Sequence, residues 1–229
     1  WRENLQWALN NGYEITVAGV ALNTEMPAPT MGLTTDATVA IRTPASAAEI
    51  GAPGGYSNGG FDYPVVGVSY REIVLWCNAL SERQNLPPYY YGYYQTVNPA
   101  KTYEHAYGAS PRGDASNQIG YRMPTNLEHL LFRQGIDTTQ FVGGSNSNEL
   151  TGVPTPVGSY PNAVNQWGMH DVWNSVWEWS SDHAWANTDI QAHLYNGDWG
   201  AAGTTMAPPR WNTAWKGLNV GFRIVRNTN

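Results

Sequence analysis

Residues 176–182, Val-Trp-Glu-Trp-Ser-Ser-Asp, carry the pattern that decides the fold. Trp177 and Trp179 are two positions apart, so on a β-strand their side chains share one face. Glu178 then points to the opposite face, where a buried carboxylate needs a polar partner. Arg223, near the C-terminus, is an arginine that could supply it. We therefore predict that these residues hold the fold together rather than carry out a reaction.

An amphipathic helix is predicted to follow Ser69. Ser69 and Glu72 have the spacing of a capping box, in which each side chain binds the other residue's backbone N–H. Four apolar residues then fall at positions i, i+3, i+4 and i+7, namely Ile73, Trp76, Cys77 and Leu80. Cys77 is therefore predicted to be a small buried core residue rather than a nucleophile, and Pro87-Pro88 ends the unit.

A second helix is predicted from Thr125, with Glu128 completing another capping box. Its apolar content comes from Leu127, Leu130, Leu131 and Phe132. Gly135 is the predicted stop. Arg122 precedes the Pro-Thr at the start of this helix, and we expect it to pair with a carboxylate and to fix the geometry of that start.

The N-terminal half has weaker patterns. Residues 1–44 are interpreted as strand-like and irregular, with alternating segments at 13–17 and 37–41. Gly and Pro predict a loop through residues 51–60. Two interpretations remain open for the tyrosine-rich residues 89–94, either a strand and loop packed over the domain or a binding patch.

The composition restricts the class of protein. Aromatic residues make up 13% of the chain and include 11 Trp, enough for a sizeable core and for a binding face. Charged residues are only 13% and the formal net charge is -6. This argues against nucleic acid as a partner, because phosphate binding requires clustered Lys and Arg.

No apolar stretch approaches the roughly 18 residues of a membrane span, so no membrane insertion is expected.

Residues 1–229 are predicted to form a single domain, because neither a tandem repeat nor a linker is recognisable. The chain is expected to end in a short strand over residues 220–226. Its single cysteine excludes an internal disulfide. No signal-peptide pattern is present, and because residue 1 is Trp rather than Met we expect a fragment or a processed form.

Four segments follow one another in the order and at the spacing of a known family. They are residues 63–69 running into 76–82, residues 120–125, residues 156–162 with 176–182, and the Gly-Phe-Arg of residues 221–223. Together they resemble the formylglycine-generating-enzyme (sulfatase-modifying factor) family. The resemblance implies an α+β C-type lectin fold of the formylglycine-generating-enzyme type, with two main helices, short antiparallel strands and many long loops.

Two departures from the family pattern bear on catalysis. The enzymes need paired cysteines near the C-terminus to bind copper and oxidise thiols, whereas residues 183–229 contain no cysteine. One cysteine in a distant helix cannot form such a thiolate site. Asn174-Ser175 replaces the family's Gly-Asn, and the family's Asn commonly sits in a calcium-binding loop, so calcium is put in doubt as well. We therefore expect no cofactor and no catalytic residues.

Other catalytic motifs are not recognisable. The five histidines show no helical i, i+4 metal spacing with a flanking Glu, and neither a phosphate-binding loop nor a Gly-x-Ser-x-Gly elbow is present. A metal cluster formed by His183, His193, Asp182 and Asp189 is an alternative. The leading prediction is that the chain is not an enzyme.

The same fold, with the same Trp-Glu-Trp and Gly-Phe-Arg, occurs in the variable proteins of diversity-generating retroelements in phages, bacteria and archaeal viruses. Their C-terminal segment is rewritten by reverse transcription that is error-prone at adenines, and the altered residues lie on one solvent-facing surface. The resemblance implies a ligand-binding, receptor-recognition protein on a virion or cell surface. Its candidate variable region is residues 195–219.

Codon arithmetic separates fixed from variable positions in this region. An Asn codon altered only at its adenines cannot become Trp, Met, Lys, Glu or Gln, so Trp199, Met206, Trp211, Trp215 and Lys216 are predicted to be fixed scaffold or framing residues. The candidate ligand-binding positions are Tyr195, Asn196, Asp198, Ala201, Ala202, Thr204, Thr205, Asn212, Thr213, Gly217, Leu218 and Asn219.

The expected partner is a protein or a glycan on a target surface. Two other functions remain open. One is a catalytically inactive or divergent domain of the enzyme family, and the other is a structural subunit of a phage or a cell surface.

Overall fold

The computed structural model describes residues 2–17, 20–21, 65–92, 95–111, 118–134, 158, 164–173, 175–186, 189–197, 209–215 and 220–227. Its helices are α1 (Arg2–Asn10), α2 (Tyr70–Arg83) and α3 (Asn126–Phe132). Its strands are β1 (Thr16–Val17), β2 (Val20–Ala21), β3 (Tyr90–Gly92), β4 (Gln95–Pro99), β5 (Ser110–Pro111), β6 (Tyr121–Arg122), β7 (Trp177–Ala186), β8 (Asp189–Tyr195), β9 (Arg210–Asn212), β10 (Val220–Gly221) and β11 (Val225–Arg226). No helix in these ranges is long and apolar enough to cross a membrane.

Helix α2 begins as the sequence predicts. The Ser69 hydroxyl accepts from the Glu72 N–H, and the Ser69 N–H donates to the Glu72 carboxylate at 2.9 Å, so the capping box is confirmed. Cys77 is fully buried, and this burial raises the pKa of its thiol well above the ordinary value. The prediction that Cys77 is a core residue is confirmed.

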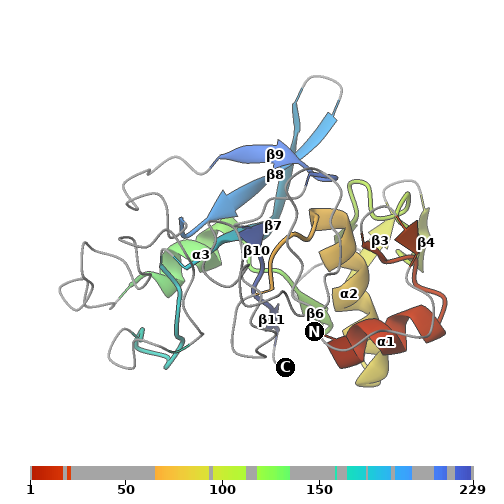
Figure 1. Ribbon diagram of the computed structural model, residues 1–229, viewed down its shortest axis with the longest axis horizontal. Coiled ribbons are helices and arrows are strands. Elements are labelled where there is room, and N and C mark those ends of the chain that lie inside the picture. The colour runs from red at the N-terminus through yellow and green to blue at the C-terminus, as the bar shows by residue number, and fades with distance from the viewer. Residues whose placement is uncertain are drawn as a thin grey trace, which may run out of the picture.

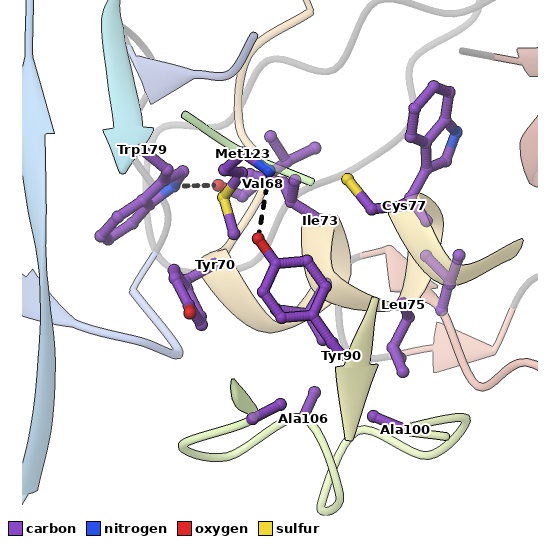
Figure 2. Close-up of a cluster of buried hydrophobic side chains, with 14 of the residues drawn as sticks. Val68, Tyr70, Ile73, Leu75, Cys77, Tyr90, Ala100, Ala106, Met123 and Trp179 are labelled. Atoms are coloured by element: carbon purple, nitrogen blue, oxygen red, sulfur yellow. Dashed lines mark hydrogen bonds between the residues drawn. The ribbon is translucent and has the colours of Figure 1, made fainter. Parts of the chain in front are cut away.

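The core surrounds α2. Figure 2 shows Tyr70, Ile73 and Cys77 of this helix in one buried cluster with Trp179 of β7 and Tyr90 of β3. Two hydrogen bonds cross this core: the Trp179 indole N–H donates to the Val68 carbonyl at 2.9 Å, and the Met123 N–H donates to the Tyr90 hydroxyl at 3.0 Å. The apolar cluster therefore contains bonds that fix one arrangement of its large side chains.

The tyrosine-rich segment is tied to the same helix. The side-chain amide of Asn78, fully buried, donates to the carbonyls of Tyr90 at 2.7 Å and Ala100 at 3.0 Å, and its oxygen accepts from the Tyr90 N–H. Tyr89 and Tyr90 are also buried. Of the two interpretations of residues 89–94, the packed strand is confirmed for Tyr89 and Tyr90. Residues 93 and 94 lie outside the described ranges.

Helix α1 contradicts the interpretation of the N-terminus as strand-like. Leu5 and Ala8 are fully buried, and the Asn4 amide donates to the Trp76 carbonyl of α2 at 3.0 Å. A helix of nine residues is only marginally stable by itself. Packing on α2 therefore stabilises it, which local sequence cannot reveal. Strand β1 falls inside the predicted segment 13–17, whereas the predictions for 37–41 and 51–60 lie outside the described residues.

Helix α3 has the predicted cap, but three of its four apolar residues are exposed. The Arg122 guanidinium binds both oxygens of Glu128, at 2.6 and 2.7 Å, and Glu128 also closes the capping box with Thr125. However, Leu127 is 66% exposed, and Leu130 and Leu131 are also exposed. The fully buried side chain of this helix is instead His129. The predicted stop, Gly135, lies outside the described residues.

The main sheet has the strand order β10-β7-β8-β9. Figure 1 shows α1 and α2 together at one end of the molecule, and β9 at one edge of this sheet beside β8. The pairing of β10 with β7 is parallel, whereas β8 pairs antiparallel with both β7 and β9. The expectation of antiparallel strands therefore holds with one exception among these pairings.

The predicted terminal strand is two strands. β10 pairs with β7, and β11 pairs with β6, so the chain leaves one partner and joins another across residues 222–224. Gly221 sits where the chain passes residue 65, and a Cβ atom on it would overlap the Val65 carbonyl oxygen. Only glycine allows this close approach of two backbones.

Candidate ligand-binding face

The predicted partnership of Glu178 and Arg223 is confirmed. Glu178 is 3% exposed and lies on the opposite face of β7 from Trp179, which is fully buried. Arg223 donates to one carboxylate oxygen of Glu178 from Nη2 at 2.8 Å and to the other from Nε at 3.1 Å. Two parallel charge-assisted hydrogen bonds fix both geometry and charge. This pair joins the C-terminal residues to the central strand.

Asn196 completes the surroundings of Glu178. Its Nδ2 donates to Glu178 Oε2 at 2.7 Å, and its Oδ1 accepts from Arg133 Nε at 3.2 Å. Asn196 is 1% exposed and has a backbone φ of 78°, which Asn and Gly tolerate better than other residues. Sequence reasoning placed Asn196 among the exposed variable positions. The expected exposure is wrong, because its side chain is enclosed by residues distant in the sequence; its variability stays a prediction.

His129 is held neutral inside this cluster. Its Nδ1 accepts from the Asn196 amide at 3.3 Å, so its proton lies on Nε2, which faces the Trp179 carbonyl at 3.4 Å. Burial lowers the pKa of His129 to about 4, although Glu178 lies 3.7 Å away and acts in the opposite direction. At neutral pH the imidazole is therefore a hydrogen-bonding member of the core rather than a cation.

Tyr195 is likewise part of the support. Its ring stacks on His129 with centroids 5.0 Å apart and planes 3° from parallel, and it is 7% exposed. The guanidinium of Arg133 lies over the rings of both Trp173 and Tyr195, 4.3 and 5.8 Å from their centroids. The expectation that Tyr195 lies on the exposed surface is also wrong.

A second anchor lies at the far end of β9. Thr213 is fully buried, so it too is not on the exposed surface. Its hydroxyl accepts from Arg71 Nε at 3.2 Å, and its carbonyl accepts from the Arg71 N–H at 3.3 Å. Asn212, half-buried, donates to the Asp189 carboxylate, which also accepts from the Tyr107 hydroxyl at 3.3 Å. These bonds tie β9 to the start of α2 and to β8.

The other predicted positions fall between these anchors or just beyond them. Asp198, Ala201, Ala202, Thr204, Thr205, Gly217, Leu218 and Asn219 lie outside the described residues.

An aromatic stack that sequence reasoning did not foresee runs from the core to the surface. Trp215 meets the buried Trp179 edge to face at 6.3 Å and stacks on Trp211 with centroids 4.4 Å apart. Trp211 is 42% exposed, and Arg210 beside it in β9 is exposed as well. In β8, the buried Ile190, Ala192 and Leu194 alternate with the half-buried Gln191 and His193. This alternation of apolar and polar residues was a sequence signal that could have identified the strand beside β9.

The doubt about calcium rests on Asn174-Ser175, and residue 174 lies outside the described residues. The carboxylate oxygens of Glu178, four positions further on, accept from the Arg223 guanidinium and from the Asn196 amide. Three residues of the alternative metal cluster, Asp182, His183 and Asp189, have other partners. Asp182 accepts from the Asn126 N–H at 2.6 Å, and His183 lies 3.5 Å from the Tyr70 hydroxyl. No grouping of three His, Cys, Asp or Glu able to hold a metal occurs in the described part of the chain.

Comparison with known proteins agrees with this architecture. The sequence profile of the sulfatase-modifying factor enzyme 1-like domain family matches residues 7–228. The chain is 25% identical over 209 residues to the chaperone protein LppX of Paenibacillus barcinonensis, across 76% of this chain and 73% of that protein.

Two solved structures share the fold. The crystal structure of CarF aligns with a TM-score of 0.66 and 20% identity, over 100% of this chain and 82% of CarF. Variable protein 1 of Treponema denticola aligns with a TM-score of 0.52 and 21% identity, over 76% of this chain and 74% of that chain. The predicted α+β C-type lectin fold is confirmed by these alignments.

Proposed function

Since the chain belongs to the sulfatase-modifying factor enzyme 1-like domain family, we propose that it is a non-catalytic member that binds ligands through a diversified segment within residues 195–219. Tyr195, Asn196 and Thr213 are buried and serve as anchors in this proposal. The ligand contacts come from the residues between and beyond them.

The anchoring at both ends of this segment carries the proposal. Asn196 is bound by Glu178 and Arg133 at one end, and Thr213 is bound by Arg71 at the other. None of these partners belongs to the segment, so its remaining residues can change without removing the bonds that hold it. A scaffold that is stable independently of its binding loops is the usual arrangement for a variable recognition surface.

The exposed Trp211 with Arg210 supports recognition of a ligand at this edge. Trp and Arg are enriched where binding energy concentrates. Trp211 is held in place by its stack on Trp215, so little conformational entropy is lost when a partner covers it. Protein and glycan are both candidate ligands, and the name of the Paenibacillus relative, a chaperone protein, supports a polypeptide.

The cysteine content supports a non-catalytic role. The only cysteine, Cys77, is fully buried, and burial raises the pKa of its thiol. A raised pKa disfavours the thiolate that copper binding and thiol oxidation require.

Comparison of this gene among isolates tests the proposal directly. We expect a near-copy of the codons for residues 195–219 close to the gene, differing from it only where the copy has adenine. The codons of Trp211 and Trp215 should be constant, whereas those of Asp198, Thr204 and Thr205 should vary. Sequencing the locus in several isolates is the measurement. Invariant codons and no near-copy would contradict diversification and favour a divergent enzyme-family domain.

Trp211→Ala is expected to weaken binding at least tenfold for ligands selected from a displayed peptide library or a glycan array, because it removes the exposed end of the aromatic stack. Trp167→Ala is the matched control, since Trp167 is 55% exposed on a different loop. Biolayer interferometry on both variants gives the comparison. Selected ligands that bind both variants equally well would argue against β9 as the recognition edge.

A further inference from the structure

A pocket of about 450 Å³ opens beside the start of β7, and the described residues that line it all lie outside the segment 195–219. The volume is within the roughly 300–1,000 Å³ of pockets that hold small ligands. Its apolar wall includes Trp76, Phe222 and Ile224, and its polar side includes Asp171, Glu178 and Arg223. Trp76 and Phe222 meet edge to face at 5.5 Å, so the two rings of this wall pack against each other.

Only some of the hydrogen-bond donors of the Arg223 guanidinium bind other residues of the described ranges. Four hydrogen bonds leave it, to the two oxygens of Glu178 and to the carbonyls of His170 and Asp171, and all four come from Nε or Nη2. Within the described ranges no group accepts from Nη1. This nitrogen carries two N–H donors on a side chain that lines the pocket.

The charges around this guanidinium select what it can bind. Glu178 already neutralises Arg223, and Asp171 adds a second carboxyl group to the lining. A ligand anion would gain from Arg223 but would be repelled by these carboxylates. A neutral acceptor such as a carbonyl oxygen gains the hydrogen bond without that repulsion, while an apolar group beside it would cover Phe222 and Ile224.

We propose that this pocket binds an apolar side chain of a partner polypeptide, with the adjoining backbone carbonyl accepting from Arg223. An apolar group next to a neutral carbonyl is the repeating chemistry of a peptide chain. The described residues that line the pocket lie outside residues 195–219, so they would be the same in every variant of the diversified face. It does not depend on that face being a binding site.

The first test of the pocket compares three small amides that bind to the unchanged protein. Addition of N-acetyl-leucine amide to the isotope-labelled full chain is expected to shift the backbone amide resonances of residues 222–224. N-acetyl-leucine amide should bind at least about tenfold more tightly than N-acetyl-glycine amide, because only it covers the apolar wall. N-acetyl-glutamate amide should bind more weakly than the leucine compound. Tighter binding of the glutamate compound, or shifts confined to residues 210–215, would overturn the proposal.

A matched pair of variants separates the pocket from general stability. Ile224→Ala shortens the apolar wall and should weaken binding of N-acetyl-leucine amide severalfold. Ile119→Ala makes the same change at another half-buried position outside the pocket lining and should leave binding unaltered. Thermal melts show whether both variants are folded. Equal affinities of the two variants for the leucine compound would also overturn the proposal.

Discussion

Glu178→Gln is expected to lower the free energy of unfolding by about 3–5 kcal/mol, because it removes one charge from a buried ion pair and leaves the other uncompensated. The substitution keeps the shape of the side chain but leaves Arg223 facing a neutral amide. It also places an amide where Asn196 Nδ2 now donates to a carboxylate at 2.7 Å. The loss should therefore spread from β7 to the anchor of the segment 195–219. Urea unfolding followed by circular dichroism measures it.

Glu3→Gln is the control for this prediction. Glu3 also pairs with an arginine, Arg83, at 3.4 Å, but its side chain is 88% exposed. Exposed ion pairs contribute little to stability, so we expect no measurable change in the free energy of unfolding. If the two variants unfold at the same urea concentration, the Glu178 cluster does not stabilise the fold through its charges.

Trp179→Ala is expected to lower the free energy of unfolding by about 3–5 kcal/mol, because a large buried side chain is lost and a cavity is left. Trp179 is fully buried, its indole N–H donates to the Val68 carbonyl, and its ring meets Tyr70 at 6.2 Å. Trp215 also rests on it, so the variant should loosen the stack that presents Trp211.

Urea unfolding again measures the stability of this variant, and near-ultraviolet circular dichroism reports the ordering of the remaining tryptophans. Trp167→Ala, at an exposed position, should unfold close to the parent chain. A Trp179→Ala variant with the parent's stability would show that the core of Figure 2 does not depend on this side chain.

Features that depend on neighbouring residues were predictable from sequence. The capping boxes of Ser69 with Glu72 and of Thr125 with Glu128 require only a three-residue spacing, and both are present. The burial of Cys77 follows from its place in a helical apolar stripe. The opposite orientations of Trp179 and Glu178 follow from strand geometry alone.

The pairing of Glu178 with Arg223 was predictable for a different reason. A carboxylate that strand geometry turns inward requires a polar partner, and Arg223 belongs to a motif of the family that the chain resembles. The need of a buried carboxylate for a polar partner, together with the family's motif, identified a contact between residues 45 positions apart.

The candidate site was predicted less well, because codon arithmetic reports which residues can arise and not which are enclosed. Asn196 and Thr213 are both reachable by adenine changes. Their burial is decided by Arg133, 63 positions from Asn196, and by Arg71, 142 positions from Thr213. A long-range partner of this kind leaves no local signal at the residue it buries.

The sequence by itself determined the starts of α2 and α3, the two faces of β7 and the family, because spacings of two to four residues and short motifs encode them. Only the tertiary structure decided that α1 is a helix, that Leu127 is exposed while His129 is buried, and that Trp211 reaches the surface. The physical reason is that burial depends on which distant elements pack together. Residues adjacent in the chain, such as Glu178 and Trp179, acquire unrelated environments once β7 has a different neighbour on each face.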